Sequence, residues 1–148
     1  MLFRSYEVLL SNDDVFSLRN TTRRLLPGAA AESAEVLTET FDLVIGRPFE
    51  IDLLFDDEAD WVGALSAEAI KRLEQEPWVD ERRHVGAGPD AANFERFNLT
   101  HGGLVLSFAP FTVGGSGSST VLITIPYRAL EGLWATDGPV APLLEKLD

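Results

Sequence analysis

The stretch Phe97–Phe108, FNLTHGGLVLSF, followed after a segment rich in glycine and serine by Val121–Tyr127, VLITIPY, decides the fold. Apolar residues lie on both sides of residues 101–103, HGG, and a glycine there allows the positive φ that a tight hairpin requires. The second run ends at Pro126, which suits the first turn of a helix. The sequence therefore predicts a three-stranded antiparallel meander that leads directly into a helix.

Upstream of the meander, two short runs with strand character flank a turn. Residues 6–10, YEVLL, and 15–19, VFSLR, lie on either side of Ser11–Asp14, whose side chains can bond their own backbone. From Ala34 the chain approaches the period of two that is expected of a strand, and we expect this third strand to end at residues 46–48, GRP. The N-terminal part therefore predicts a hairpin and a third strand.

The apolar period changes to that of a helix in the middle of the chain. One helical stripe contains Trp61, Leu65, Ala69, Ile70 and Leu73. We expect Ser66 to cap this helix at its N-terminus and Pro77 to end it. Residues 80–90 are charged and then rich in glycine and proline, so they are predicted to form a flexible connection. Two short helices, over residues 127–134 and 140–147, complete the pattern.

These elements predict one α+β domain that spans residues 1–148. Its antiparallel sheet is built from the N-terminal hairpin, the third strand and the C-terminal meander. The central helix and the short C-terminal helices pack against it. A chain of 148 residues suits a single domain, because at this size one core buries most of the surface of the unfolded chain.

The composition excludes several classes of function. With 24 acidic and 12 basic side chains the formal charge is −12, which repels nucleic acid and anionic membranes and either keeps the protein soluble or attracts a basic partner. No cysteine is present, so neither a disulfide nor a thiolate metal site can form. The first residues lack the pattern of a signal peptide, and no window approaches the ~18 apolar residues of a membrane-spanning helix. We expect no membrane insertion by this chain.

The densest group of carboxylates is Asp56, Glu58 and Asp60, at alternate positions. Hard cations prefer such oxygen ligands, but Trp61 stands where a calcium-binding loop needs glycine. Acidic side chains also favour the start of a helix because of its dipole. We therefore interpret the three carboxylates as a helix start, with a metal site as the weak alternative, and predict no metal and no cofactor.

No group of residues identifies an enzyme. Residues 114–118, GGSGS, resemble the serine-bearing turn of esterases, but that motif needs glycine where Ser118 stands. A nucleophilic Ser116 would also need a base, and the two histidines, His84 and His101, lie in a charged loop and at a hairpin turn. The tryptophans are interpreted as core or rim packing and not as a platform for sugars. We therefore predict no catalytic residue.

An ordered set of segments resembles a known family. The matching segments are Val15–Leu18, Gly28-Ala29, Thr40–Pro48, Ile51–Phe55, Phe97–Thr100, Gly103–Phe108, Phe111 and Ile125–Leu130. In this order they resemble the C-terminal domain that is shared by the anti-sigma factor RsiV and some bacterial peptidoglycan deacetylases. The resemblance covers almost the whole chain.

The resemblance implies an α+β fold with an antiparallel sheet, an extracytoplasmic setting in the cell envelope, and a role in binding or sensing. In RsiV the domain takes part in recognising lysozyme, and in the deacetylases catalysis belongs to a separate domain. This chain departs from the family at Ala30, where a histidine is usual, and in the Gly114–Ser119 loop. The candidate ligand-binding residues around that loop are Phe111, Gly114, Ser116 and Ser118.

We therefore expect a non-catalytic domain of a bacterial cell-envelope protein that binds a protein or a cell-wall glycan. Two alternatives remain open at this point. One is a small envelope hydrolase that acts on esters or glycans, and the other is a structural or dimerisation domain.

Overall fold

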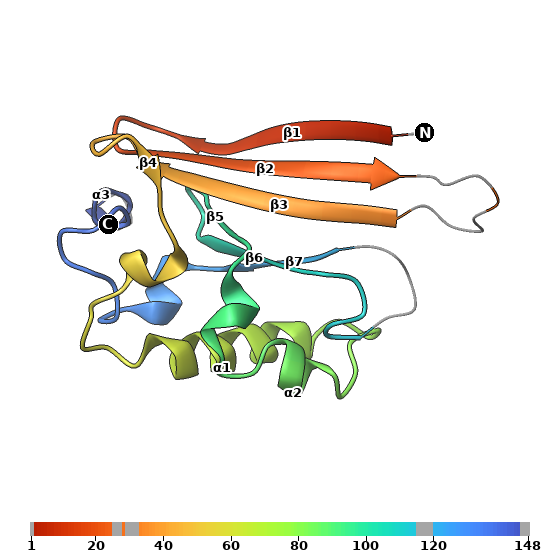
Figure 1. The fold of residues 1–148 in the computed structure, drawn as a ribbon. Helices are drawn as coiled ribbons and strands as arrows, with labels where there is room; N and C mark the ends of the chain where they lie inside the picture. Colours follow the sequence, from red (N-terminus) through yellow and green to blue (C-terminus); the bar gives the residue numbers. More distant parts are fainter. Residues whose placement is uncertain (1, 25–27, 29–32, 115–119, 146–148) are drawn as a thin grey trace.

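The computed structural model describes residues 2–24, 28, 33–114 and 120–145 of the chain. Two antiparallel sheets and several short helices form it, which confirms the α+β prediction. The strands do not join in one sheet, because the N-terminal strands and the meander pair separately. Figure 1 shows the four-stranded sheet on one side of the molecule, the longest helix on the other, and the meander between them.

The first sheet has the order β1 (Leu2–Ser11), β2 (Val15–Arg24), β3 (Ser33–Asp42) and β4 (Arg47–Pro48). The predicted hairpin of β1 and β2 is confirmed. In its turn, the side-chain oxygen of Asn12 accepts hydrogen bonds from the backbone N–H groups of Asp14 and Val15. A short polar side chain therefore closes this turn, as its residue types indicate.

The predicted extent of the third strand was wrong, because β3 ends at Asp42. The Asp42 carboxylate accepts hydrogen bonds from the N–H groups of Val44 and Ile45, and its carbonyl accepts one from Gly46. These bonds make a turn, after which β4 pairs back with the end of β3.

The second sheet is the predicted meander of β5 (Phe97–Leu99), β6 (Leu104–Phe108) and β7 (Val121–Ile125). The turn between β5 and β6 depends on Gly103, which has a φ of +156°. A Cβ atom at this position would lie 2.4 Å from the carbonyl oxygen of Ile125 in β7. Glycine therefore lets the hairpin turn pass close to the neighbouring strand.

The predicted central helix is confirmed as α1 (Trp61–Leu73), although its ends differ from the expectation. Asp60, and not Ser66, caps it by accepting a hydrogen bond from the N–H of Gly63. Ser66 is buried inside the helix and donates its hydroxyl proton to the carbonyl oxygen of Ala87, at 2.6 Å. The helix ends at Leu73, ahead of Pro77.

Residues 80–90 were wrongly predicted to be a flexible connection, because they contain α2 (Arg83–Gly86) and are tied down by hydrogen bonds. The amide of Asn93 donates to the carbonyl oxygens of Val85 and Gly88. Near the start of the segment, Arg82 donates to the carboxylate of Asp80 and lowers the pKa of that carboxyl group to about 2.

Four further short helices are described. Between β4 and β5 lie η1 (Ile51–Leu54) and η2 (Ala91–Phe94), and after β7 lie η3 (Tyr127–Leu130) and α3 (Ala141–Leu144). The helix predicted over residues 127–134 is a single 3-10 turn, and the one predicted over 140–147 is one short α-helical turn. Over the described ranges, no helix is long and apolar enough to cross a membrane.

The core lies between the meander and α1. All residues of β5 and β6 are buried. The apolar core includes Leu65, Ala69 and Leu73 of α1 together with Phe97, Leu99, Leu104, Leu106 and Phe108 of these strands. The first sheet meets β5 through a buried polar contact. There, the Ser17 hydroxyl oxygen accepts hydrogen bonds from the Leu99 N–H and the Asn98 amide and is bonded to the Thr40 hydroxyl. A polar contact of this kind positions the two sheets relative to each other.

Candidate functional site

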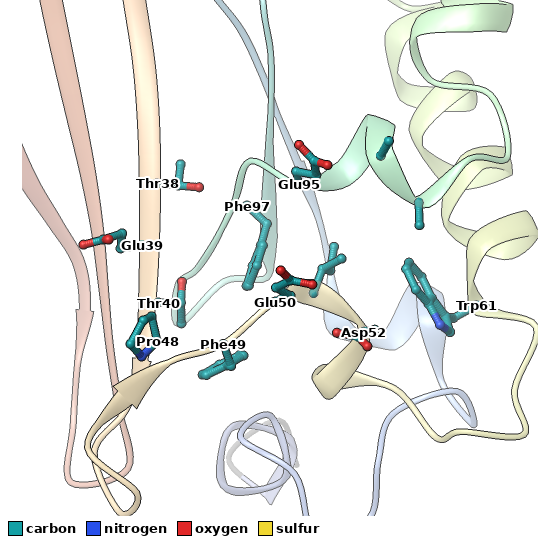
Figure 2. A pocket seen from close by; sticks show the side chains of 13 residues that line it. Thr38, Glu39, Thr40, Pro48, Phe49, Glu50, Asp52, Trp61, Glu95 and Phe97 are labelled. Carbon is teal, nitrogen blue, oxygen red and sulfur yellow. The ribbon is translucent and has the colours of Figure 1, made fainter.

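A hollow of about 730 Å³ lies between the end of the first sheet and the helices. Its walls come from β3, the segment from β4 to η1, the first residue of α1, and η2. We call it the acidic cleft. In Figure 2, Phe97 and the side chains of Glu50, Asp52 and Glu95 lie between Thr38 of β3 and Trp61 of α1.

Carboxylates dominate the polar lining of this cleft. They are Glu39, Glu50, Asp52 and Glu95, and no lysine or arginine is among the thirteen residues that line it. All four are exposed to solvent. With no basic side chain to neutralise them, the cleft presents a region of negative potential that favours cations.

Aromatic side chains form the apolar part of the lining. Phe49 and Phe97 have ring centroids 6.1 Å apart, and Trp61 lies at the other side of the cleft. The ring of Trp61 stacks on Phe55 at 4.8 Å with an interplanar angle of 1°. Phe55 stacks in turn on Trp134, also at 4.8 Å. A half-buried indole in the wall of the cleft is thus held in place by an aromatic stack behind it.

The far end of this stack is anchored by buried hydrogen bonds. Tyr127 packs edge-on against Trp134, and the indole N–H of Trp134 donates to the Tyr127 carbonyl oxygen at 2.9 Å. The Tyr127 hydroxyl donates to the carbonyl oxygen of Thr100 at 2.6 Å, and burial raises the pKa of this hydroxyl. These bonds connect the aromatic wall of the cleft to the β5–β6 turn.

A second acidic hollow, of about 620 Å³, lies at the other end of η1. Its carboxylates are Asp42, Asp56, Asp57, Glu58 and Asp137, and again no lysine or arginine lines it. Leu53 and Phe55, which follow the acidic-cleft residues Glu50 and Asp52, form part of its wall. Both hollows therefore give the surface around η1 a negative charge.

The predicted metal candidates do not gather around a common point. The Asp56 carboxylate accepts a hydrogen bond from the N–H of Glu58, and Asp60 caps α1. Within the part of the chain that the structure describes, no group of three or more acidic or histidine side chains could hold a metal ion. The helix-start interpretation is confirmed for Asp60.

The structure describes two of the four predicted ligand-binding residues around the loop after β6, Phe111 and Gly114. Phe111 is 49% exposed and has a φ of +68°, which is uncommon for a residue other than glycine. Gly114 is buried, has a φ of +135°, and pairs with Val79. A Cβ atom there would lie 2.6 Å from the backbone nitrogen of Asp80, so close backbone packing explains this glycine. Ser116 and Ser118 lie outside the described residues, and the binding role of this loop stays a prediction.

Sequence reasoning did not find the acidic cleft. Its carboxylates come from β3, from the segment beside η1 and from the residue after η2, and no motif spacing relates them. The tryptophans were interpreted as packing, which is confirmed for the buried Trp134. Trp61 packs on Phe55 and also lines the cleft.

Comparison with known proteins identifies the family and the fold. Residues 52–128, which are 77 of the 148 residues, match the family described as protein of unknown function (DUF3298). No curated protein matches the chain.

Two crystal structures of DUF3298 family proteins share the fold. One, from Bacteroides fragilis, superimposes with a TM-score of 0.69 at 18% identity, over 97% of this chain and 58% of that chain. Another, from Pseudomonas aeruginosa, has a TM-score of 0.61 at 15% identity, over 90% of this chain and 62% of that chain. This chain therefore spans about three-fifths of the length of either structure. Because the family match covers more than half of the sequence, this protein belongs to the DUF3298 family, whose function is unknown.

Proposed function

We propose that this protein is a non-catalytic binding domain of a bacterial cell-envelope protein, and that its acidic cleft takes a positively charged segment of a partner protein. The observation that carries the proposal is the lining of the cleft, in which four carboxylates occur and no lysine or arginine. A ligand of opposite charge gains from this potential, and an anionic one is repelled.

The aromatic side chains in the wall of the cleft also favour a cationic ligand. Lysine and arginine side chains bind favourably over the face of an indole ring, and Trp61 lies within the lining. Its stacking on Phe55 fixes the ring before a ligand arrives. Binding would then cost little side-chain entropy at this residue.

The charge around the cleft extends beyond its own lining. The second hollow adds five carboxylates at the other end of η1, and the whole chain has a formal charge of −12. A field of this sign accelerates the approach of a basic protein, and the effect weakens as salt screens it. A basic protein that contacts both hollows would use the surface around η1.

The setting in the cell envelope rests on the resemblance of the sequence to the C-terminal domain of RsiV and of some peptidoglycan deacetylases. A binding role agrees with the absence of a catalytic motif from the sequence. Within that role, the lining of the cleft favours a basic protein over a cell-wall glycan.

The test is titration calorimetry at low and at moderate salt, with lysozyme as the basic protein and soluble peptidoglycan fragments as the glycan. We expect lysozyme to bind and its affinity to fall as salt rises. In the double variant Glu50→Gln, Asp52→Asn the affinity should fall by about 2- to 30-fold, since two exposed ion pairs contribute about 0.4–2 kcal/mol together.

The matched control is the double variant Asp13→Asn, Glu76→Gln, which removes the same charge at exposed positions outside the two acidic hollows. It should leave lysozyme affinity nearly unchanged. An equal loss in both variants would show attraction by net charge alone and contradict a role for the cleft. Binding of glycan fragments without lysozyme binding would contradict the cationic ligand.

A further inference from the structure

A third hollow, of about 330 Å³, adjoins the acidic cleft and shares Ala92 and Glu95 with it. Its walls come from α2, η2, the end of β6 and the residues that follow β6. Unlike the two acidic hollows, it has an arginine in its lining, Arg96. We call it the Arg96 hollow.

Ser107 of β6 lines this hollow, and its buried hydroxyl group has no hydrogen-bond partner among the described residues. The residue is only 3% exposed. Its backbone N–H donates a hydrogen bond to the carbonyl oxygen of Arg96, at 2.9 Å, so only the side chain lacks a hydrogen-bond partner. A buried hydroxyl without a partner destabilises the folded protein, and such a group calls for an explanation such as a bound ligand.

The second group is the guanidinium of Arg96, which has no partner within the protein among the described residues. The side chain is half-buried, yet within the described part of the chain it has no hydrogen bond and no ion pair. Three other arginines of similar burial each have a carboxylate partner: Arg19 pairs with Glu7, Arg72 with Glu68 and Arg83 with Glu74. Of these four half-buried arginines, Arg96 alone has no carboxylate partner among the described residues.

We propose that the Arg96 hollow binds a small monocarboxylate, with the Arg96 guanidinium and the Ser107 hydroxyl as the groups that contact the ligand. A guanidinium donates two parallel hydrogen bonds to a carboxylate, and a hydroxyl can donate a third. One ligand would then give the buried Ser107 hydroxyl a hydrogen-bond partner and the Arg96 guanidinium a carboxylate partner.

The rest of the lining favours a ligand with no more than one negative charge and a short apolar tail. Glu95 also lines this hollow, and Glu95 and the charge of the whole chain repel a dianion such as phosphate more strongly than a monoanion. The apolar contacts come from Ala92, Phe108 and Ala109. The volume fits a ligand of a few heavy atoms. This proposal does not depend on the cationic ligand proposed for the acidic cleft.

The test is a titration of the ¹⁵N-labelled protein with sodium propionate, followed by NMR and compared with sodium chloride and sodium phosphate at equal ionic strength. We expect saturable shifts at the amides of Arg96, Ser107 and Ala109 with propionate only. Affinity for propionate should fall by about tenfold or more in Arg96→Gln and, less strongly, in Ser107→Ala.

The control Arg47→Gln removes the same charge at an exposed position on β4 and should bind propionate like the natural protein. Ser107→Ala removes an unsatisfied group and is expected to fold, so it keeps the test valid if Arg96→Gln unfolds. Shifts that never saturate, equal shifts with phosphate, or unchanged affinity in Ser107→Ala would each overturn the proposal.

Discussion

The two sheets of this protein pair in the same antiparallel way, but they differ in burial. The meander lies between α1 and the first sheet, and every residue of β6 is buried (Figure 1). The first sheet is covered on one face, and Tyr6, Val8 and Leu37 on its strands are exposed. Since apolar burial is the main stabilising term, the comparison indicates that the meander and α1 carry most of the stability.

The largest effect that distinguishes the two sheets is expected from shortening one leucine in each. Leu106 of β6 is 0% exposed, and Leu106→Ala should reduce the free energy of unfolding by about 2–5 kcal/mol. Leu37 of β3 is 49% exposed, and Leu37→Ala should change it by less than about 1 kcal/mol. Urea denaturation measures both. Equal losses would show that the first sheet contributes as much as the meander.

A smaller effect is expected at the contact between the sheets. In Ser17→Ala, the Leu99 N–H and the Asn98 amide lose an acceptor in a buried place, which should cost about 1–3 kcal/mol. We expect hydrogen exchange to accelerate more in β1 and β2 than in β6. Uniform acceleration would show that the two sheets unfold only together.

The control for this prediction is the same substitution at Ser107, where the hydroxyl has no partner among the described residues. Without a bound ligand, Ser107→Ala should leave stability unchanged or raise it, because no hydrogen bond is lost. The same substitution at two buried serines, one in each sheet, is thus expected to lower stability at Ser17 and not to lower it at Ser107.

The smallest expected effect is a pH dependence of the stability, which arises from Tyr127 in η3. The pKa of Tyr127 is raised by burial, whereas an unfolded tyrosine has a pKa of about 10. Its neutral form is favoured in the folded state, so its contribution is complete below pH 10 and is lost as the pH rises above that value. We expect the loss to be about 1 kcal/mol per pH unit.

Thermal unfolding between pH 8 and 11 checks this expectation. Tyr127→Phe should flatten the alkaline loss of stability, and Tyr6→Phe on the exposed face of the first sheet should not. An unchanged pH profile in Tyr127→Phe would assign the alkaline loss to other groups.

The fold could be predicted from the sequence wherever the pattern is local. The apolar runs on both sides of the glycines at 102–103 indicate the meander, and the stripe from Trp61 to Leu73 indicates α1. Ser66 was wrongly assigned as a cap because its partner, the carbonyl oxygen of Ala87, lies 21 residues away along the chain. A serine at the start of an apolar run has the same local pattern whether it caps a helix or bonds a distant loop.

The candidate sites could not be predicted from the sequence, because folding assembles them from distant residues. Glu39 and Glu95 lie in one cleft although 56 positions separate them. No sequence pattern singles out Arg96, because only the folded structure shows that its side chain has no carboxylate partner among the described residues. Ser107 reads in the sequence as an ordinary residue of a strand.

The aromatic stack behind the acidic cleft has an optical consequence. Trp61 and Trp134 lie on the two sides of Phe55, and the third tryptophan, Trp78, is exposed elsewhere on the surface. Indole emission responds to the polarity and charge of its surroundings, and Trp61 lies in the wall of the cleft. With Trp78 replaced by phenylalanine, the tryptophan fluorescence of this protein would come from Trp61 and Trp134 alone, so the protein contains its own label for events at the cleft.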